Sequence, residues 1–508
     1  MYHMKIGFFL QGRFAYIGHT MNVLFKERYG IKDFCGYVSM RLSRNFLYNQ
    51  KEIKYSALVL NEDVHAKYKN EKIDHKYLEY LEKEYGIPNL WPYLTVDRVI
   101  RYNLFIRAYP HDTSIYSHED MMKLVQVTAR AIIKFFEEEK PDCVIFSVVG
   151  TLGSLLLYQI AKKKNIKTLI IEAARIDNKY FLTEEYDRPT YILKSLEYIK
   201  EHSSEELVVK YLKEAEVFLG NFREKKNYYF EASESFAALT RTPSRLKNLE
   251  FLLPKNLLRF ARWLVRYLPE YWEYRNDYST PNPLYVFWDK IVKKLRIVIG
   301  YEDLCDKAVS GENYIYFPLQ AEPEAQPMLL TQFYEDQIWL IKQIAKSLPL
   351  QYKLYVKDHH WMIGYRPRKY YREIKKIPNV KLIDVSVKGI DLIQNSRAVI
   401  TTVGTSGWEG LLLKKPVIVF GKIFYSYLPG VKHCSSVEDL PHLIKGILEK
   451  PMPDYDKEII QFIAAMFRES VDIDFYQIWD VEGGGKLAER KNQLVPLVDL
   501  LAQKLGLL

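Results

Sequence analysis

The sequence has few cysteines and no paired ones. Its 508 residues include Cys35, Cys143, Cys305 and Cys434, and no two of these form a Cys-x-x-Cys pair. This spacing excludes a disulfide framework and the common cysteine-based zinc patterns. A reducing compartment is therefore expected, and the cytoplasm is the predicted location.

Long hydrophobic runs are also missing. No stretch of about 20 uncharged apolar residues occurs anywhere, so no membrane-spanning helix is expected. The N-terminal run MYHMKIGFFLQGRF is too short in apolar residues for a signal peptide and reads as a strand. There is no low-complexity tract. These absences favour a globular protein, with peripheral contact at the inner face of the cell membrane as the one membrane association kept open.

The charge is not strongly biased to one sign. Lys and Arg number 73 against 63 Asp and Glu, a net charge of +10, and there are 40 tyrosines. A basic surplus with aromatic residues fits nucleic acid, an anionic membrane or phosphorylated substrates. Because the basic residues are dispersed along the chain, nucleic acid is not expected as a partner.

Two distant segments share one pattern, PDCVIFSVVGTLGSLLLYQIAKKKNIKTLII from Pro141 and NSRAVITTVGTSGWEGLLLKKPVIVFG from Asn395. Each has an apolar run, then Val-Gly-Thr-x-Gly, then a helical run ending in Lys-Lys, then another apolar run. Strands that alternate with helices indicate βαβ units and a parallel sheet. The repetition predicts an α/β protein with two Rossmann-like domains facing a cleft, because a chain of this length exceeds one hydrophobic core.

The remaining segments define the expected boundaries. Residues 1–187 are predicted to form the first Rossmann-like domain, 188–304 a helical insertion, 305–455 the second Rossmann-like domain and 456–508 a C-terminal helical segment. Residues of about 73–103 and 117–140 are predicted to be helical. Strands are predicted at residues 4–11, 314–319, 351–357, 380–385, 397–402 and 416–421.

The strongest chemical pattern is TTVGTSGWEG. A glycine turn between a buried strand and a helix lets backbone N–H groups face an anion, and the helix dipole adds to this. The residues that would bind a nucleotide here are Gly404, Thr405, Ser406, Gly407 and Glu409. Ser406 would also serve as a helix cap, and Glu409 would bind a ribose. The same pattern is typical of an ordinary strand-to-helix turn, and it is neither a Walker loop nor Gly-x-Gly-x-x-Gly.

VKDHHW follows a predicted strand, so Lys357, His359 and His360 are expected at its carboxyl end, where open α/β sheets bind ligands. A histidine there is suited to a phosphate oxygen, and a hydrogen-bonded loop histidine is the alternative. A metal site is not expected, because adjacent histidines point apart on an extended chain.

Carboxylates in two places are candidates for acid–base catalysis. Glu322 and Glu324 lie with Gln320 in a loop with three prolines, which should prevent a helix. Glu172 and Asp177 follow a strand of the first domain, where Arg175 and Asp177 would equally form a structural ion pair. Tyr425, after the last strand, would stack on a base or sugar or close the core.

Residues 245–272 interleave basic and large apolar residues at helical spacing, bounded by Pro254 and Pro269. A basic amphipathic helix of this kind binds an anionic membrane or packs its apolar face on a core.

The C-terminal half resembles the bacterial capsule polysaccharide biosynthesis family over roughly residues 312–430. The matching elements are Lys357-Asp358-His359, Thr405-Ser406-Gly407-Trp408-Glu409, Gly421-Lys422-Ile423-Phe424-Tyr425 and the loop Pro318 to Glu324. His360 stands where the family usually has proline. The family includes transferases for the acidic sugar Kdo and has the GT-B architecture of two Rossmann domains.

The resemblance implies that His359, Ser406 and Glu409 hold the nucleotide of an activated sugar, without a metal or other cofactor. The expected function is glycosyl transfer from a nucleotide-sugar donor to a surface polysaccharide, a glycolipid or another glycan, including lipid-linked ones. The alternatives are a sugar-nucleotide epimerase or hydrolase on the same scaffold, and a non-catalytic nucleotide- or glycan-binding subunit.

Overall fold

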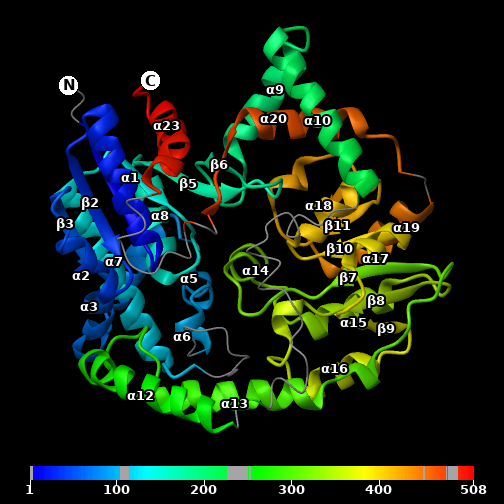
Figure 1. The fold of residues 1–508 in the computed structure, drawn as a ribbon, viewed down its shortest axis with the longest axis horizontal. Coiled ribbons are helices and arrows are strands. Elements are labelled where there is room, and N and C mark those ends of the chain that lie inside the picture. Colours follow the sequence, from blue (N-terminus) through cyan, green and yellow to red (C-terminus); the bar gives the residue numbers. More distant parts are fainter. Residues whose placement is uncertain are drawn as a thin grey trace.

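The computed structural model describes residues 4–87, 89–102, 114–225, 250, 253–449, 452–475, 478 and 490–508. Two separate sheets, each covered by helices on both faces, form the two halves of the molecule (Figure 1). The predicted α/β class with two Rossmann-like domains is confirmed.

The first sheet has seven strands within the described residues, in the order β13-β6-β5-β4-β1-β2-β3. The strands β1 to β5 are parallel, whereas β6 pairs antiparallel with β5 and β13 pairs antiparallel with β6 at one edge. Their bounds are β1 Lys5–Leu10, β2 Asp33–Val38, β3 Tyr55–Leu60, β4 Cys143–Phe146, β5 Lys167–Ala173, β6 Lys179–Thr183 and β13 Ser470–Asp472.

Alternation along β1 explains how helices cover both faces of this sheet. Ile6, Phe8 and Leu10 pack in one cluster with α1 (Phe14–Tyr29) and α23 (Val495–Lys504). Phe9 packs in the other, with α7 (His118–Glu139) and α8 (Leu152–Lys163). Strands buried on both faces read as continuous apolar runs, as KIGFFL does.

The second sheet has six parallel strands within the described residues, in the order β12-β11-β10-β7-β8-β9. Their bounds are β7 Tyr314–Pro318, β8 Lys353–Lys357, β9 Val380–Ile383, β10 Ala398–Thr401, β11 Val417–Val419 and β12 Val431–His433. The covering helices include α15 Gln337–Ser347, α16 Arg368–Lys375, α17 Gly389–Asn395, α18 Thr405–Leu412 and α19 Leu440–Glu449.

The predicted helical region 73–103 is divided into α4 (His75–Glu84), α5 (Trp91–Thr95) and α6 (Arg98–Tyr102). Gly86 has φ +62° just after α4, a conformation that ends helices. Residue 103 lies outside the described part of the chain.

The C-terminal segment crosses between the two halves. Helix α20 (Asp456–Arg468) packs on α9 (Thr190–Glu201) and α10 (Glu206–Lys225), where Arg223 pairs with Asp456 at 2.6 Å. The chain then enters β13 of the first sheet, and α23 packs on α1. Residues 456–508 therefore contain a strand besides the expected helices. That strand is only three residues long, too short to show a period.

Helices α12 (Pro254–Tyr274) and α13 (Pro283–Ile299) run along one edge of the molecule, beneath both halves (Figure 1). The prediction that Pro269 ends the first of them is wrong, since α12 continues through it. Pro269 is exposed, so its ring meets solvent. Residues 245–249, 251 and 252 of the predicted amphipathic segment lie outside the described residues.

Among the described residues, no helix has both the length and the apolar character needed to cross a membrane.

Candidate functional site

Loops that are distant in the sequence meet at the carboxyl edge of the second sheet. Gln320 follows β7, and its side-chain amide donates to the Thr401 hydroxyl at the end of β10, at 3.1 Å. The backbone N–H of Gly404 donates to the same hydroxyl, also at 3.1 Å. The Tyr425 hydroxyl, from the loop after β11, donates to the Gly404 carbonyl at 2.5 Å. Three of the predicted donor-binding segments are thus connected by hydrogen bonds.

The turn between β10 and α18 has no room for larger residues. A Cβ atom on Gly404 would lie 2.7 Å from both the Gln320 amide and the Thr401 hydroxyl. A Cβ atom on Gly407 would lie 2.8 Å from Cζ of Tyr425. Glycine is required at both positions by the close approach of these neighbours. Backbone conformation does not require it, since Gly404 has a negative φ and Gly407 lies within α18.

The prediction that Ser406 caps α18 is wrong. Gly404 is the N-cap, and among the described residues no side chain caps this helix. Ser406 lies inside the first turn with 9% of its surface exposed, whereas Thr405 before it is partly exposed. The first N–H groups of α18 and the Thr405 hydroxyl therefore lie at the carboxyl edge of the sheet.

Glu409 lies one turn into α18 and is 1% exposed. Burial, with a smaller contribution from the Glu409 charge, raises the pKa of both Tyr316 and Tyr425. Burial lowers the pKa of Lys357, and the carboxylates of Asp358 and Glu409 oppose that effect. The Glu409 carboxylate therefore lies close enough to Lys357 to stabilise its positive charge.

The two histidines after β8 lie together. The rings of His359 and His360 stack with centroids 4.7 Å apart, so the expectation that they point apart is wrong. The reason is local: His359 caps a short 3-10 turn, His360–Met362, and its Nδ1 accepts the Trp361 backbone N–H at 3.3 Å. An accepting Nδ1 places the proton of neutral His359 on Nε2. Burial, and next the Lys357 charge, lower the pKa of His360 to about 4.

A buried ionic network supports the loops after β7 and β8, and the sequence analysis did not predict it. The Arg366 guanidinium is ion-paired with Asp358 and donates to the Gln320 carbonyl at 2.6 Å and to Glu322 at 3.1 Å. Asp358 also accepts from the Tyr371 hydroxyl at 2.5 Å. No sequence signal marks Arg366, which stands in the irregular run GYRPR.

Glu322 belongs to this network. It accepts hydrogen bonds from Arg366 and Gln337, and burial raises its pKa while the Arg366 charge opposes that rise. Its carboxylate is therefore engaged in holding the loop after β7.

Helix α14 (Ala325–Leu330) lies between the two halves, where a loop without helix was expected. Pro327 occupies its first turn, in which backbone N–H groups have no intrahelical partner, so the missing donor costs little. Met328 and Leu329 pack in the core cluster of the first domain. Gly150, in the loop before α8, contacts Ala325 so closely that a Cβ atom there would overlap with it.

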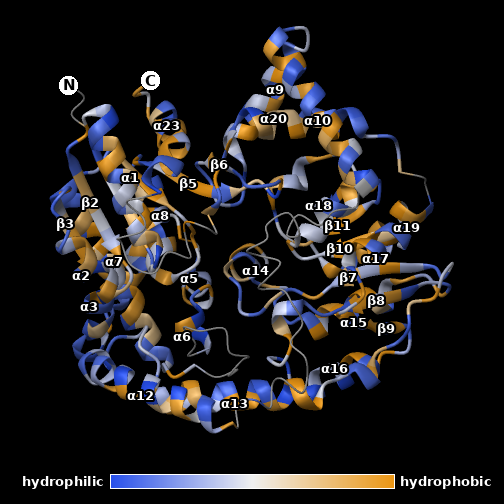
Figure 2. Cartoon of the chain, viewed as in Figure 1, coloured by the Kyte–Doolittle hydropathy of each residue, from blue (hydrophilic) through white to orange (hydrophobic). Residues whose placement is uncertain are grey.

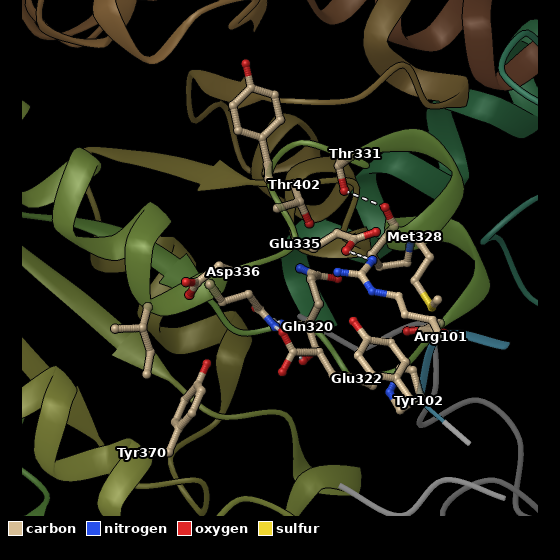
Figure 3. A pocket seen from close by; sticks show the side chains of 17 residues that line it. Arg101, Tyr102, Gln320, Glu322, Met328, Thr331, Glu335, Asp336, Tyr370 and Thr402 are labelled. Atoms are coloured by element: carbon tan, nitrogen blue, oxygen red, sulfur yellow. Dashed lines mark hydrogen bonds and ion pairs between the residues drawn. The ribbon is translucent and has the colours of Figure 1, made fainter. Parts of the chain in front are cut away.

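A cavity of about 410 Å³ lies between the halves on one side of α14 (Figure 3). Arg101 of α6 reaches across it to form an ion pair with Glu335 of the second domain. Gln320 and Thr402 line the wall formed by the second sheet. Of the predicted site residues, Gln320, Glu322 and Glu324 line this cavity, and Glu324 is also the N-cap of α14.

Glu172 lies on the other side of α14. It lines a small cavity of about 30 Å³ together with Arg175, Gln326 and Leu330. Burial raises the pKa of Glu172 to about 7, and Arg175 opposes this rise. Asp177 is exposed in the turn after β5 at φ +43°, and does not line that cavity. The four predicted catalytic carboxylates therefore do not meet at one place.

Residues 267–440 match the family model described as capsule polysaccharide biosynthesis protein. The predicted resemblance is thereby confirmed over the part of the chain that carries Gln320, His359, Glu409 and Tyr425. No curated protein matches the chain in sequence.

Solved structures with a similar chain course include two transferases of Thermosulfurimonas dismutans. KpsC beta Kdo 2,4 transferase is 13% identical, with a TM-score of 0.37, covering 68% of this chain and 88% of its own. KpsC beta Kdo 2,7 transferase is 12% identical, with a TM-score of 0.35, covering 72% and 89%. The UDP-GlcNAc 2-epimerase of Neisseria meningitidis bound to UDP-GlcNAc is 12% identical, with a TM-score of 0.27, covering 97% and 99%.

Proposed function

We propose that this chain is a glycosyltransferase that uses a nucleotide sugar, and the match of residues 267–440 to the capsule polysaccharide biosynthesis family model supports this proposal. The donor is held at the carboxyl edge of the second sheet, and the acceptor is a surface polysaccharide, glycolipid or related glycan. The observation that carries the proposal is the hydrogen-bonded convergence of Gln320, Thr401, Gly404 and Tyr425 beside the start of α18.

The groups at that edge suit a phosphate. The first N–H groups of α18 and the helix dipole favour an anion, and the Thr405 and Ser406 hydroxyls add donors. His359 carries its proton on Nε2, and Lys357 is the nearest cation on β8. Donors fixed in this way stabilise the charge that develops on a departing nucleotide, by about 3–4 kcal/mol for each donor in known cases. Metal-independent transfer follows from this part of the proposal.

Glu172 is the candidate general base. A carboxylate with a pKa near 7 accepts a proton from an acceptor hydroxyl more readily than one with an ordinary pKa. It stands on the first domain, residues 1–187, which we propose binds the acceptor, whereas residues 305–455 bind the donor. Glu322 acts as a positioning residue through Arg366. Glu324 and Asp177 are weaker candidates, since Glu324 lies across α14 from Glu172, in the other cavity, and Asp177 is exposed in a turn.

The experiment is to measure nucleotide release from a panel of nucleotide sugars with and without a lipid-linked glycan fraction, in the presence of EDTA. Release that requires the glycan, persists in EDTA and is lost in Glu172→Gln supports the proposal. Epimerised sugar nucleotide formed without the glycan would assign an epimerase. Release of free sugar without the glycan would assign a hydrolase, and nucleotide binding without any turnover would assign a non-catalytic subunit.

A further inference from the structure

Helix α12 carries a stripe of large apolar side chains that face solvent. Leu258, Val265 and Trp272 recur at seven-residue intervals and are 58%, 70% and 61% exposed. Residues seven apart lie on the same face of a helix, two turns from one another. The stripe therefore runs along the helix and is left uncovered.

Helix α13 carries a second stripe of the same kind. Leu284 and Trp288 are 72% and 63% exposed, and Leu295 and Ile299 are 44% and 64% exposed. Their spacing of four, seven and four residues again places these side chains on one face of the helix. Figure 2 shows the hydrophobic colour recurring along both helices at the edge of the molecule.

The two helices concentrate exposed apolar surface. Of the 21 large apolar side chains that are exposed among the described residues, eight lie within residues 253–299. Single exposed apolar residues are normal on protein surfaces, whereas contiguous ones mark an interaction site. This concentration of exposed apolar side chains favours an interaction surface over incidental exposure.

The same helices are strongly basic. Together α12 and α13 contain eight Lys and Arg against three Asp and Glu, a net charge of +5, half the net charge of the whole chain. Arg259, Arg262 and Arg266 are exposed next to the stripe on α12. Long basic side chains extend from an apolar face towards lipid headgroups, and tryptophan prefers the boundary between headgroups and acyl chains.

Other contacts hold the two helices on the protein, so the stripes are not needed for that purpose. The rings of Phe260 and Phe287 stack with centroids 4.4 Å apart where the helices meet. At the turn between them, Asp277 pairs with Arg41 of the first domain at 2.7 Å. At the far end, the Gly300 carbonyl accepts from Arg368 of the second domain at 3.0 Å.

We propose that α12 and α13 form a docking element for the surface of a membrane rich in anionic lipids. Charge selects this occupant: two copies of a +5 surface repel each other, whereas an anionic lipid surface attracts it, at about 1 kcal/mol per basic residue. An amphipathic helix with a basic polar face and Trp and Leu on the other face lies in the plane of such a surface.

This proposal does not depend on the chemistry proposed above, but it is consistent with a lipid-linked acceptor. Arg368, which contacts the end of α13, begins α16, and Tyr370 two residues later lines the cavity between the domains. Docking would therefore hold that side of the cavity near the lipid surface.

The test is co-sedimentation of the full chain with phosphatidylcholine vesicles, with and without phosphatidylglycerol. We expect binding only to the anionic vesicles, weakened by salt. The stripe variant Leu258→Ser/Val265→Ser/Trp272→Ser should lose it. A matched control, Leu207→Ser/Val217→Ser/Leu350→Ser, removes exposed apolar residues from other parts of the surface and should bind like the wild type.

A variant that changes charged residues separates the electrostatic contribution to vesicle binding from the apolar one. Arg259→Glu/Arg262→Glu/Arg266→Glu should weaken binding by at least about fivefold for each residue changed. Unchanged thermal unfolding identifies variants that keep their fold. The proposal is overturned if the wild type stays in the supernatant with anionic vesicles, if the control loses binding as fully as the stripe variant, or if the stripe variant only abolishes a dimer.

Discussion

Asp358 and Arg366 form an ion pair in which neither side chain has any exposed surface. Arg366 also holds the loop after β7 through Gln320 and Glu322, so the pair connects the loop that carries His359 to the loop that carries Gln320. The candidate donor site therefore rests on a charged pair that is buried from solvent.

Breaking this pair should be costly. Asp358→Asn leaves the Arg366 charge buried with only part of its compensation, and we expect it to lower the free energy of unfolding by about 3 kcal/mol. Asp303→Asn is the control, because it breaks the ion pair of Arg368 with a carboxylate that is 63% exposed and should cost no more than about 1 kcal/mol. Urea unfolding compares the two, and equal effects would contradict the assigned role of Asp358.

Two neighbouring tyrosines should respond differently to loss of the hydroxyl. Tyr425→Phe leaves the buried Gly404 carbonyl without its donor, and we expect a loss of about 1–3 kcal/mol of stability. Tyr427→Phe removes a hydroxyl bonded to the Asp187 carbonyl on a side chain that is 39% exposed, and should cost less than about 0.5 kcal/mol. Thermal unfolding with and without nucleotide measures both, and a harmless Tyr425→Phe would remove this tyrosine from the turn's support.

Replacement by alanine should change the stability of the protein in opposite directions at two glycines. Gly150→Ala forces α14 away from the first domain, because its Cβ would overlap with Ala325, and should lower the melting temperature. Gly446→Ala, inside α19 with open space around it, should raise stability by about 0.5–1 kcal/mol. If both variants are stabilised, α14 does not press against the first domain as described.

The pKa of Glu172 gives a pH dependence with a defined sign. A raised native pKa means that the folded state binds this proton more tightly, so the contribution to stability is complete below about pH 4.3 and is lost as pH rises through about 7. The transfer rate should show the opposite trend and rise through pH 7, since the base must be ionised. Glu172→Gln should abolish both dependences. A rate profile that is unchanged in this variant would assign the base to another group.

The strands were predictable from the sequence, and most of the support for the site was not. Short apolar runs located β7, β8, β9, β10 and β11, because parallel strands buried on both faces need such runs. The partner of Asp358 could not be found in this way, since Arg366 approaches it through the irregular loop after β8. The burial of Glu409 and the separation of Glu172 from Glu322 by α14 depend on tertiary packing. The stacking of His359 on His360 depends on a local turn that strand geometry does not predict.

The surroundings of the exposed helices were likewise not predictable from the sequence. Basic and apolar residues at helical spacing allowed both a core-facing and a membrane-facing helix for residues 245–272. The seven-residue spacing of Leu258, Val265 and Trp272 shows that they share one face of the helix. It does not show whether the protein core covers that face. Only the exposed fractions of those side chains distinguish the two readings.

Nucleotide binding at the start of α18 is tested by a thermal-shift titration with CMP, CDP, UDP, GDP and TDP in EDTA. One nucleotide at 100 times its dissociation constant should stabilise the wild type by about 2.7 kcal/mol. Thr405→Ala/Ser406→Ala should weaken that binding about tenfold or more. Ser347→Ala, at the opposite edge of the sheet, should leave it unchanged. Binding that survives loss of both hydroxyls, or no shift with any of the five nucleotides, would contradict a nucleotide site at the start of α18.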